Sequence, residues 1–153
     1  MPPDVTPSLT APHTLQYTYK RSLGKVLSAF FTGLRDKKIL GVRRKDGTVL
    51  VPPKEYDPDT AESLSQMVEV GQAGVVRSWS WVPRPREKQP LKKPFAYALI
   101  QLDGAATPLL HAVDAGSEAK MKTGMRVRAR WAEKTVGAIT DIACFVPEQE
   151  SAR

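Results

Sequence analysis

The sequence predicts a mainly β protein in which a small barrel of the OB type follows one helix and one hairpin. The chain has 153 residues, the usual size of one domain, and 41% of them are hydrophobic, so a single core can form. Its 13 prolines and 10 glycines, set against 7% aromatic residues, favour short elements joined by many turns over a helical bundle. Between residues 66 and 147, short apolar runs separated by turn signals predict about five strands, as in a small Greek-key barrel.

The N-terminal segment is predicted to be an extended arm. Residues 1–21 contain four prolines among scattered polar residues. Because proline fixes φ and removes a backbone donor, the segment is not expected to form a helix or a central strand. Tyr17 and Tyr19 are its candidate anchor points.

Residues 22–38 are predicted to form an amphipathic helix. Apolar residues recur at the spacing of one helix face, namely Leu23, Val26, Leu27, Phe30, Phe31 and Leu34. Ser22 is the expected N-cap, and residues 36–38 end the segment on solvent. Two interpretations of the apolar face stay open. It packs against the rest of the domain, or Phe30 and Phe31 dock into a partner protein.

Residues 39–65 are predicted to contain a hairpin and a second turn. Two β-rich runs flank the turn Lys45-Asp46-Gly47, and Asp-Gly between such runs is a strong hairpin signal. The pair Pro52-Pro53 ends the hairpin, and a second turn is expected around Asp57-Pro58-Asp59.

Residues 66–147 are assigned to the barrel, and residues 148–153 to a tail. The expected strands cover residues 68–82, a long strand bent at Gly71 and Gly74, and residues 95–102, 109–113, 125–131 and 139–146. The run 95–102 is apolar at nearly every position, as expected for a strand covered on both faces. In residues 125–131, apolar residues alternate with arginines, which predicts a strand with one buried and one wet side.

The charge balance and the cysteine content limit the function classes. Lys and Arg number 23 against 16 Asp and Glu, a net charge of +7, so the expected partner is polyanionic: nucleic acid, an anionic membrane surface or a phosphate-bearing small molecule. The single cysteine, Cys144, excludes an intrachain disulfide and a zinc site built on cysteines. The N-terminus shows no signal-peptide pattern, and no apolar run approaches the ~20 residues needed to span a bilayer, so a cytoplasmic location is expected.

A basic loop is the first candidate site. Residues 83–94 place five basic residues and four prolines between two predicted strands. Proline stiffens such a loop, so its cations are held apart and outward, where they can bind phosphates. The candidates are Arg84, Arg86, Lys92 and Lys93. The alternative is that the loop is only a solvated connector.

A second set of residues bears on nucleic-acid binding. Arg126, Arg128 and Arg130 would form a row about 7 Å apart on one side of a strand, able to track phosphates, although such a row is more often the wet face of a half-buried strand. Trp79 and Trp81 are expected to share a face with Arg77, the arrangement on which single-stranded bases stack, although a tryptophan in a small barrel is more often part of the core.

No catalytic centre is found in the sequence. His13 lies in the arm, and His111 has no Ser, Cys or carboxylate nearby in a recognisable motif. Cys144 is interpreted as a small buried hydrophobe. The glycines of residues 71–74 lack the helix and the lysine of a phosphate-binding loop.

The order of these pieces resembles a known family. The motifs, in chain order, are Phe30-Phe31-Thr32-Gly33-Leu34, Ile39-Leu40-Gly41, Val51-Pro52-Pro53, Gly71 with Gly74-Val75-Val76, Phe95-Ala96-Tyr97-Ala98-Leu99-Ile100-Gln101-Leu102-Asp103-Gly104 and Gly124-Met125-Arg126-Val127. Over residues 17–147 the chain resembles the thiolase-associated OB-fold proteins that carry an N-terminal, rubredoxin-like zinc ribbon.

The chain departs from that family at the metal site. The resemblance implies a Cys-x-x-Cys-Gly on the hairpin and a second Cys-x-x-Cys after the paired prolines, but here residues 43–47 read Arg-Arg-Lys-Asp-Gly and residues 57–60 read Asp-Pro-Asp-Thr. All four ligands are missing, so zinc is not expected, and residues 39–65 are a degenerate, metal-free ribbon. We expect cations of the first loop to face acids of the second in an exposed pairing that contributes little to stability.

The resemblance implies a function. Family members are non-catalytic partners of thiolase-superfamily enzymes, among them acyl-CoA thiolases and the aldolases that cleave steroid side-chain CoA thioesters. By that resemblance the chain is not an enzyme itself and needs no cofactor of its own. It would support a catalytic subunit and help to hold or admit an acyl-CoA, whose phosphates suit the cationic loop. The alternative is a single-stranded nucleic-acid-binding OB-fold protein.

Overall fold

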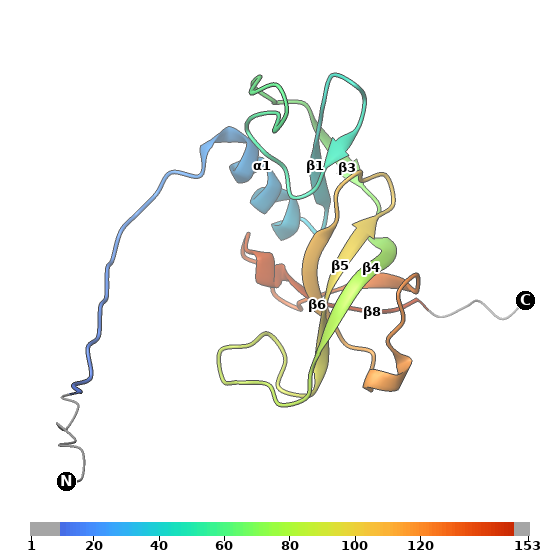
Figure 1. Cartoon of the computed structure of the whole chain (residues 1–153). Helices are drawn as coiled ribbons and strands as arrows, with labels where there is room; N and C mark the ends of the chain where they lie inside the picture. The colour runs from blue at the N-terminus through green and yellow to red at the C-terminus, as the bar shows by residue number, and fades with distance from the viewer. Residues whose placement is uncertain (1–9, 149–153) are drawn as a thin grey trace, which may run out of the picture.

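The computed structural model describes residues 10–148 and shows one helix, a small sheet and a closed barrel (Figure 1). The small sheet has the strand order β2-β1-β3, and the barrel has the order β4-β5-β6-β8-β7. The first nine residues of the predicted arm and residues 149–153 of the predicted tail lie outside the described residues. The mainly β fold predicted from the sequence is confirmed.

Helix α1 spans Gly24–Arg35, which is shorter at both ends than the predicted 22–38. The predicted Ser22 cap is wrong, because the N-cap is Leu23 and Gly24 takes a left-handed φ of +71°. At the other end, the N–H of Lys38 donates to the carbonyl of Gly33 at 2.8 Å, and Lys37 takes φ +57°. This is the Schellman arrangement, which satisfies the last carbonyls of a helix and stops it.

The small sheet contains the predicted hairpin and one strand from beyond it. Strand β1 (Ile39–Arg43) pairs antiparallel with β2 (Val49–Leu50), as predicted, and on its other side with β3 (Met67–Val70). The predicted boundary placed residues from 66 onward in the barrel, but the register brings Val70 opposite Ile39. Strand β3 therefore belongs to the small sheet.

Five strands close the barrel: β4 (Ala73–Val82), β5 (Phe95–Leu102), β6 (Leu109–Val113), β7 (Arg126–Trp131) and β8 (Ile142–Pro147). All neighbours are antiparallel except β6 and β8, which pair in parallel. A five-stranded Greek-key barrel of this kind is an OB-fold, as predicted. Gly74 permits the close approach of β4 to β5, since a Cβ there would lie 2.4 Å from the carbonyl oxygen of Gln101.

The last strand begins later than predicted. Residues 139–146 were expected to be extended, but Ile139–Asp141 forms a short 3-10 helix, η2. The cause is the carboxylate of Asp141, which is buried and accepts the backbone N–H groups of Val136, Gly137 and Ala138 at 2.7–3.1 Å. Burial alone would raise the pKa of Asp141, but these three donors outweigh it and lower the pKa.

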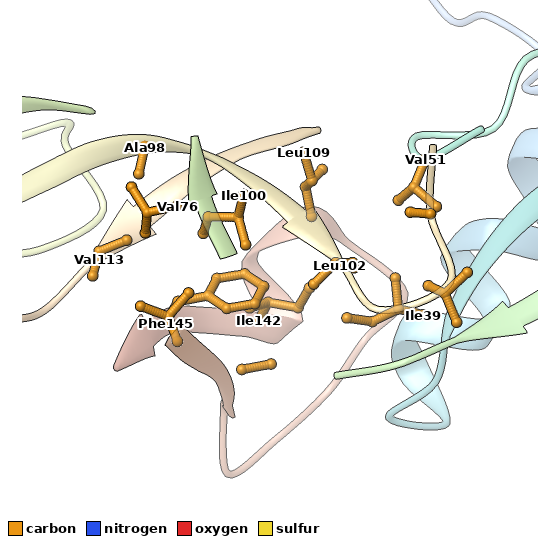
Figure 2. Close-up of a cluster of buried hydrophobic side chains, with 14 of the residues drawn as sticks. Ile39, Val51, Val76, Ala98, Ile100, Leu102, Leu109, Val113, Ile142 and Phe145 are labelled. Carbon is orange, nitrogen blue, oxygen red and sulfur yellow. The ribbon is translucent and has the colours of Figure 1, made fainter. Parts of the chain in front are cut away.

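One hydrophobic core joins the helix and the small sheet to the barrel. Phe30, Leu34 and Ile39 belong to the same buried cluster as Ile100 and Phe145. Figure 2 shows this continuity, with Ile39 beside the side chains of the barrel strands. In residues 10–148, no helix has the length and apolarity to cross a bilayer.

Candidate functional site

The predicted basic loop connects β4 to β5 and projects from one end of the barrel (Figure 1). Its four candidate residues, Arg84, Arg86, Lys92 and Lys93, are all exposed. A turn closed by Arg86 and Gln89 holds the loop, because each residue's N–H bonds the other residue, at 2.8 and 3.0 Å. The ammonium group of Lys92 donates to the carbonyl of Glu87.

The loop keeps its positive charge. Among residues 10–148, no carboxylate lies within 4.0 Å of a cation of this loop. Its only acid is Glu87, against five basic residues. A cluster of unpaired, exposed cations is an electrostatic binding site for an anion, and its strength falls with added salt.

Two pockets meet at Leu91, at the end of this loop. The first, of about 390 Å³, is mainly apolar and has Tyr97, Leu110 and Ile139 in its wall. The second, of about 270 Å³, is lined by Lys92, Lys93, Asp114 and Arg130 along with Leu91 and Pro94. Asp114 is already paired with Arg130 at 3.1 Å, so the two lysines remain available. The pair of pockets can therefore hold a molecule with an apolar part and an anionic part.

His111 lines the apolar pocket but is poorly suited to proton transfer. Burial lowers the pKa of His111 below its usual value, which favours the neutral ring at neutral pH. Its Nδ1 accepts the N–H of Ala112 at 2.9 Å, and Nε2 lies 3.5 Å from the carbonyl of Ile139. Burial also raises the pKa of Cys144, so that thiol is not activated. Within the described residues, no hydrogen bond joins a histidine to a Ser, Thr or Cys side chain.

The arginine row on β7 is neutralised by carboxylates. Arg126 binds both oxygens of Asp103 at 2.7 and 2.8 Å and also Glu148 at 3.0 Å. Arg128 lies 3.7 Å from Glu148, and Arg130 is paired with Asp114. The row is therefore the wet face of a half-buried strand, the alternative that the sequence left open.

The predicted stacking face does not form. A β-bulge at Arg77 changes the alternation of β4, because Val76 pairs with Ile100 while Ser78 pairs with Leu99. After the bulge, Trp79 and Trp81 are half-buried and pack against the core, whereas Arg77 is exposed. The expectation that these tryptophans share a face with Arg77 is wrong.

The two phenylalanines of α1 have different environments. Phe30 is 2% exposed and lies in the core, so it cannot be offered to a partner in this conformation. Phe31 is half-buried and contacts Phe30 edge to face, with ring centroids 5.4 Å apart. For Phe30, the packing interpretation of the helix face therefore holds.

Ion pairs connect the two loops of the degenerate ribbon. Arg44 binds Asp57 through two hydrogen bonds of 2.7 and 3.0 Å and also contacts Asp59, while Lys45 pairs with Glu62. The predicted pairing of cations with acids is confirmed, but it is not fully exposed, since Asp57 is buried. The hydrogen bonds from Arg44 lower the pKa of Asp57 to about 2.

These residues do not fit a zinc ion. Arg44 places a fixed positive charge between the two loops, and it has no lone pair to donate. No thiolate is available there, because the only cysteine lies in β8. Within residues 10–148, no group of three or more His, Cys, Asp or Glu side chains is placed to hold a metal.

The comparison with family models decides what kind of barrel this is. Residues 67–132, from β3 through β7, match the family described as the C-terminal OB-fold domain of ChsH2. This part of the chain is similar to that OB-fold domain. The family resemblance predicted from the order of the motifs is thereby confirmed. The search of curated proteins gave no significant match.

Two solved structures share the fold of this chain. The first is a DUF35-family protein of unknown function from Sulfolobus solfataricus, with a TM-score of 0.57 and 24% identity over 70% of this chain and 77% of that one. The second is a chain of the Ltp2–ChsH2(DUF35) aldolase, with a TM-score of 0.61 and 20% identity over 84% of this chain and 98% of that one.

Sequence reasoning missed the pocket beside the basic loop. Its wall is assembled from the loop and from three other parts of the chain, with Leu91, Tyr97, Leu110 and Ile139 converging. A signal was present, since Leu91 is the only apolar residue of the loop apart from its prolines. Leu110 gave no such signal, because only the structure shows that 60% of its surface is exposed on a barrel strand.

Proposed function

We propose that this chain is a non-catalytic accessory subunit that binds and supports a thiolase-superfamily enzyme, either an acyl-CoA thiolase or acyltransferase or a steroid side-chain aldolase. The observation that carries the proposal is the ChsH2-type barrel, because the same fold occurs in a chain of the Ltp2–ChsH2(DUF35) aldolase. The chemistry of the side chains supports it: burial lowers the pKa of His111, whose Nδ1 accepts a backbone N–H, and burial raises the pKa of Cys144.

The second part of the proposal is that the chain helps to hold or admit the acyl-CoA. Such a molecule combines an apolar acyl group with several phosphate charges. The apolar pocket at Tyr97 and Leu110 suits the first, and the cationic pocket at Lys92 and Lys93 suits the second. Both pockets open beside Leu91, so one ligand can reach both.

The accessory role is tested by co-expression. The tagged full chain is produced with each thiolase-superfamily enzyme of its own genome, and complexes are isolated by affinity and gel filtration. We expect one enzyme to co-purify and to lose activity or solubility when this chain is omitted. A full set of enzymes that are active and soluble alone, with no complex formed, contradicts the proposal.

The role of the basic loop is tested in that complex by three double variants. Lys92→Ala/Lys93→Ala removes the pocket cations, Arg84→Ala/Arg86→Ala removes the outer ones, and Lys120→Ala/Lys122→Ala is a charge-matched control on the exposed segment before β7. The variants are compared by their KM for acyl-CoA. The first is expected to raise KM about two- to tenfold, the second less, and the control not at all.

Equal KM values for the wild type and the two loop variants would show that the loop is only a connector. The KM increase should also shrink at higher ionic strength, since exposed charge pairs are screened by salt.

A further inference from the structure

The described part of the N-terminal arm alternates like a β-strand but pairs with nothing in its own chain. Leu15, Tyr17 and Tyr19 occupy every second position, separated by Gln16 and Thr18. Successive side chains of a strand point to opposite sides, so this segment has one apolar and one polar side. In residues 10–20 there is no helix or strand, and none of their backbone groups bonds another described residue.

The apolar side of the arm is unusually exposed. Leu15, Tyr17 and Tyr19 are 67%, 76% and 83% exposed, and Figure 1 shows the segment running away from the body of the protein. Where the arm reaches α1, Arg21 and the exposed Leu23 and Tyr56 line a groove of about 500 Å³. Tyrosines next to a concave surface are typical of protein interfaces.

We propose that residues 15–20 add as a β-strand to an exposed sheet edge of the catalytic subunit, with Tyr17 and Tyr19 as its anchors. This inference rests on the proposed accessory role and names the segment that makes the contact. Strand addition satisfies the unpaired backbone groups of the arm, and alternate side chains supply the specificity.

Charge defines the chemistry of the surface that receives the arm. Residues 10–35 contain Lys20, Arg21, Lys25 and Arg35 and no acid at all. Lys20 and Arg21 follow the two tyrosines directly, so the receiving edge carries acidic side chains at the end that meets them.

The arm is poorly matched to a second copy of this chain. The small sheet has two edge strands, β2 and β3, of two and four residues, and both are shorter than the six-residue segment. The edge of β4 beyond Val76, where β7 no longer pairs with it, carries Arg77 and leads into the basic loop, and two copies with a net charge of +7 repel each other. A nucleic acid is also disfavoured, because Leu15 offers no ring for stacking and the cations lie only at one end of the segment.

The test measures the affinity of the full-length chain for the enzyme that co-purifies with it. Tyr17→Ser/Tyr19→Ser is expected to weaken binding about tenfold or more, and Gln16→Ser/Thr18→Ser, on the polar side of the same strand, less than about twofold. Both variants should keep the wild-type circular dichroism and melting temperature, since these residues are exposed and make no hydrogen bond to another described residue. Hydrogen exchange in the complex should slow at alternate amides of residues 15–20.

Each other outcome overturns the inference. If both variants bind the enzyme as tightly as the wild type does, the accessory role stands and the arm is excluded from the contact. Tyrosine-dependent dimerisation of the isolated chain would assign the arm to a second copy, and tyrosine-dependent binding of a single-stranded 20-mer DNA at low salt would assign it to nucleic acid. Failure of the wild type to bind any of the enzymes overturns the accessory role and this inference together.

Discussion

Truncation of Phe30 tests whether the helix face is core or interface. The side chain is 2% exposed, packs in the cluster that contains Leu34, and meets Phe31 edge to face. Replacing a buried phenylalanine by alanine costs ~3–5 kcal/mol, because apolar contact is lost and a cavity remains. Since domains are stable by only ~5–15 kcal/mol, Phe30→Ala should remove a large part of the stability. The corresponding fall in melting temperature is roughly 6–20 °C.

The assay is urea denaturation followed by circular dichroism, with Phe31→Ala as the matched variant. Phe31 is half-buried, so its truncation should cost less than half as much as truncation of Phe30. Reduced affinity for the catalytic subunit in Phe31→Ala, without loss of fold, would support docking at this position. A loss below ~1 kcal/mol for Phe30→Ala would refute the assignment of Phe30 to the core.

Three further predictions concern the residues that shape the body of the protein. Because Arg44 lowers the pKa of Asp57 to about 2, the ionised Asp57 contributes stability that is present above pH 4 and lost as the pH falls toward 2. In an acid titration, the stability of Asp57→Asn should therefore fall less steeply over that range than that of the wild type. Identical curves for the two proteins would contradict the pairing. Gly74→Ala should lower the stability by ~1–3 kcal/mol, because the new Cβ would meet the backbone of β5. Thermal denaturation checks this, with Ser78→Ala, at an exposed position of the same strand, as the control. Equal melting temperatures for the two variants would argue against the close approach. Asp141→Ala should speed amide exchange at residues 136–138, whose N–H groups it accepts, and unchanged exchange would show that the turn holds without the carboxylate.

Local patterns were enough to predict most of the elements. The alternation in residues 126–131 gave a strand with Val127 and Ala129 buried and the arginines exposed, as the structure has it. The Asp-Gly turn gave the hairpin, because Gly47 takes a φ of +87° that few other residues adopt. These features are set by neighbouring residues, so the sequence carries them directly.

Features that depend on distant parts of the chain were not predictable from local patterns. Strand β3 pairs with β1 because of contacts across about 30 residues, and no local pattern marks that choice. The bulge at Arg77 turned two tryptophans toward the core, and the carboxylate of Asp141 replaced the start of a strand by a turn. The apolar pocket is likewise assembled from four separate segments.

The net charge that a group of basic residues presents depends on the carboxylates that face it. The sequence shows two groups of basic residues, the arginines of β7 and the loop of residues 83–94, with similar composition. Only the structure shows that Asp103, Asp114 and Glu148 neutralise the first group and that the second keeps its charge among the described residues. Both groups could therefore be identified as candidates from the sequence, but only the structure excludes the arginines of β7.

The most direct measurement of the central claim is the activity of the co-purified thiolase-superfamily enzyme with and without this chain. If the chain is an accessory subunit, the purified enzyme alone should show reduced turnover of acyl-CoA or reduced solubility, and adding the separately purified chain at an equimolar ratio should restore it. The chain alone should turn over no acyl-CoA. Turnover of acyl-CoA by the isolated chain, or an enzyme that is equally active and soluble without it, would contradict the account.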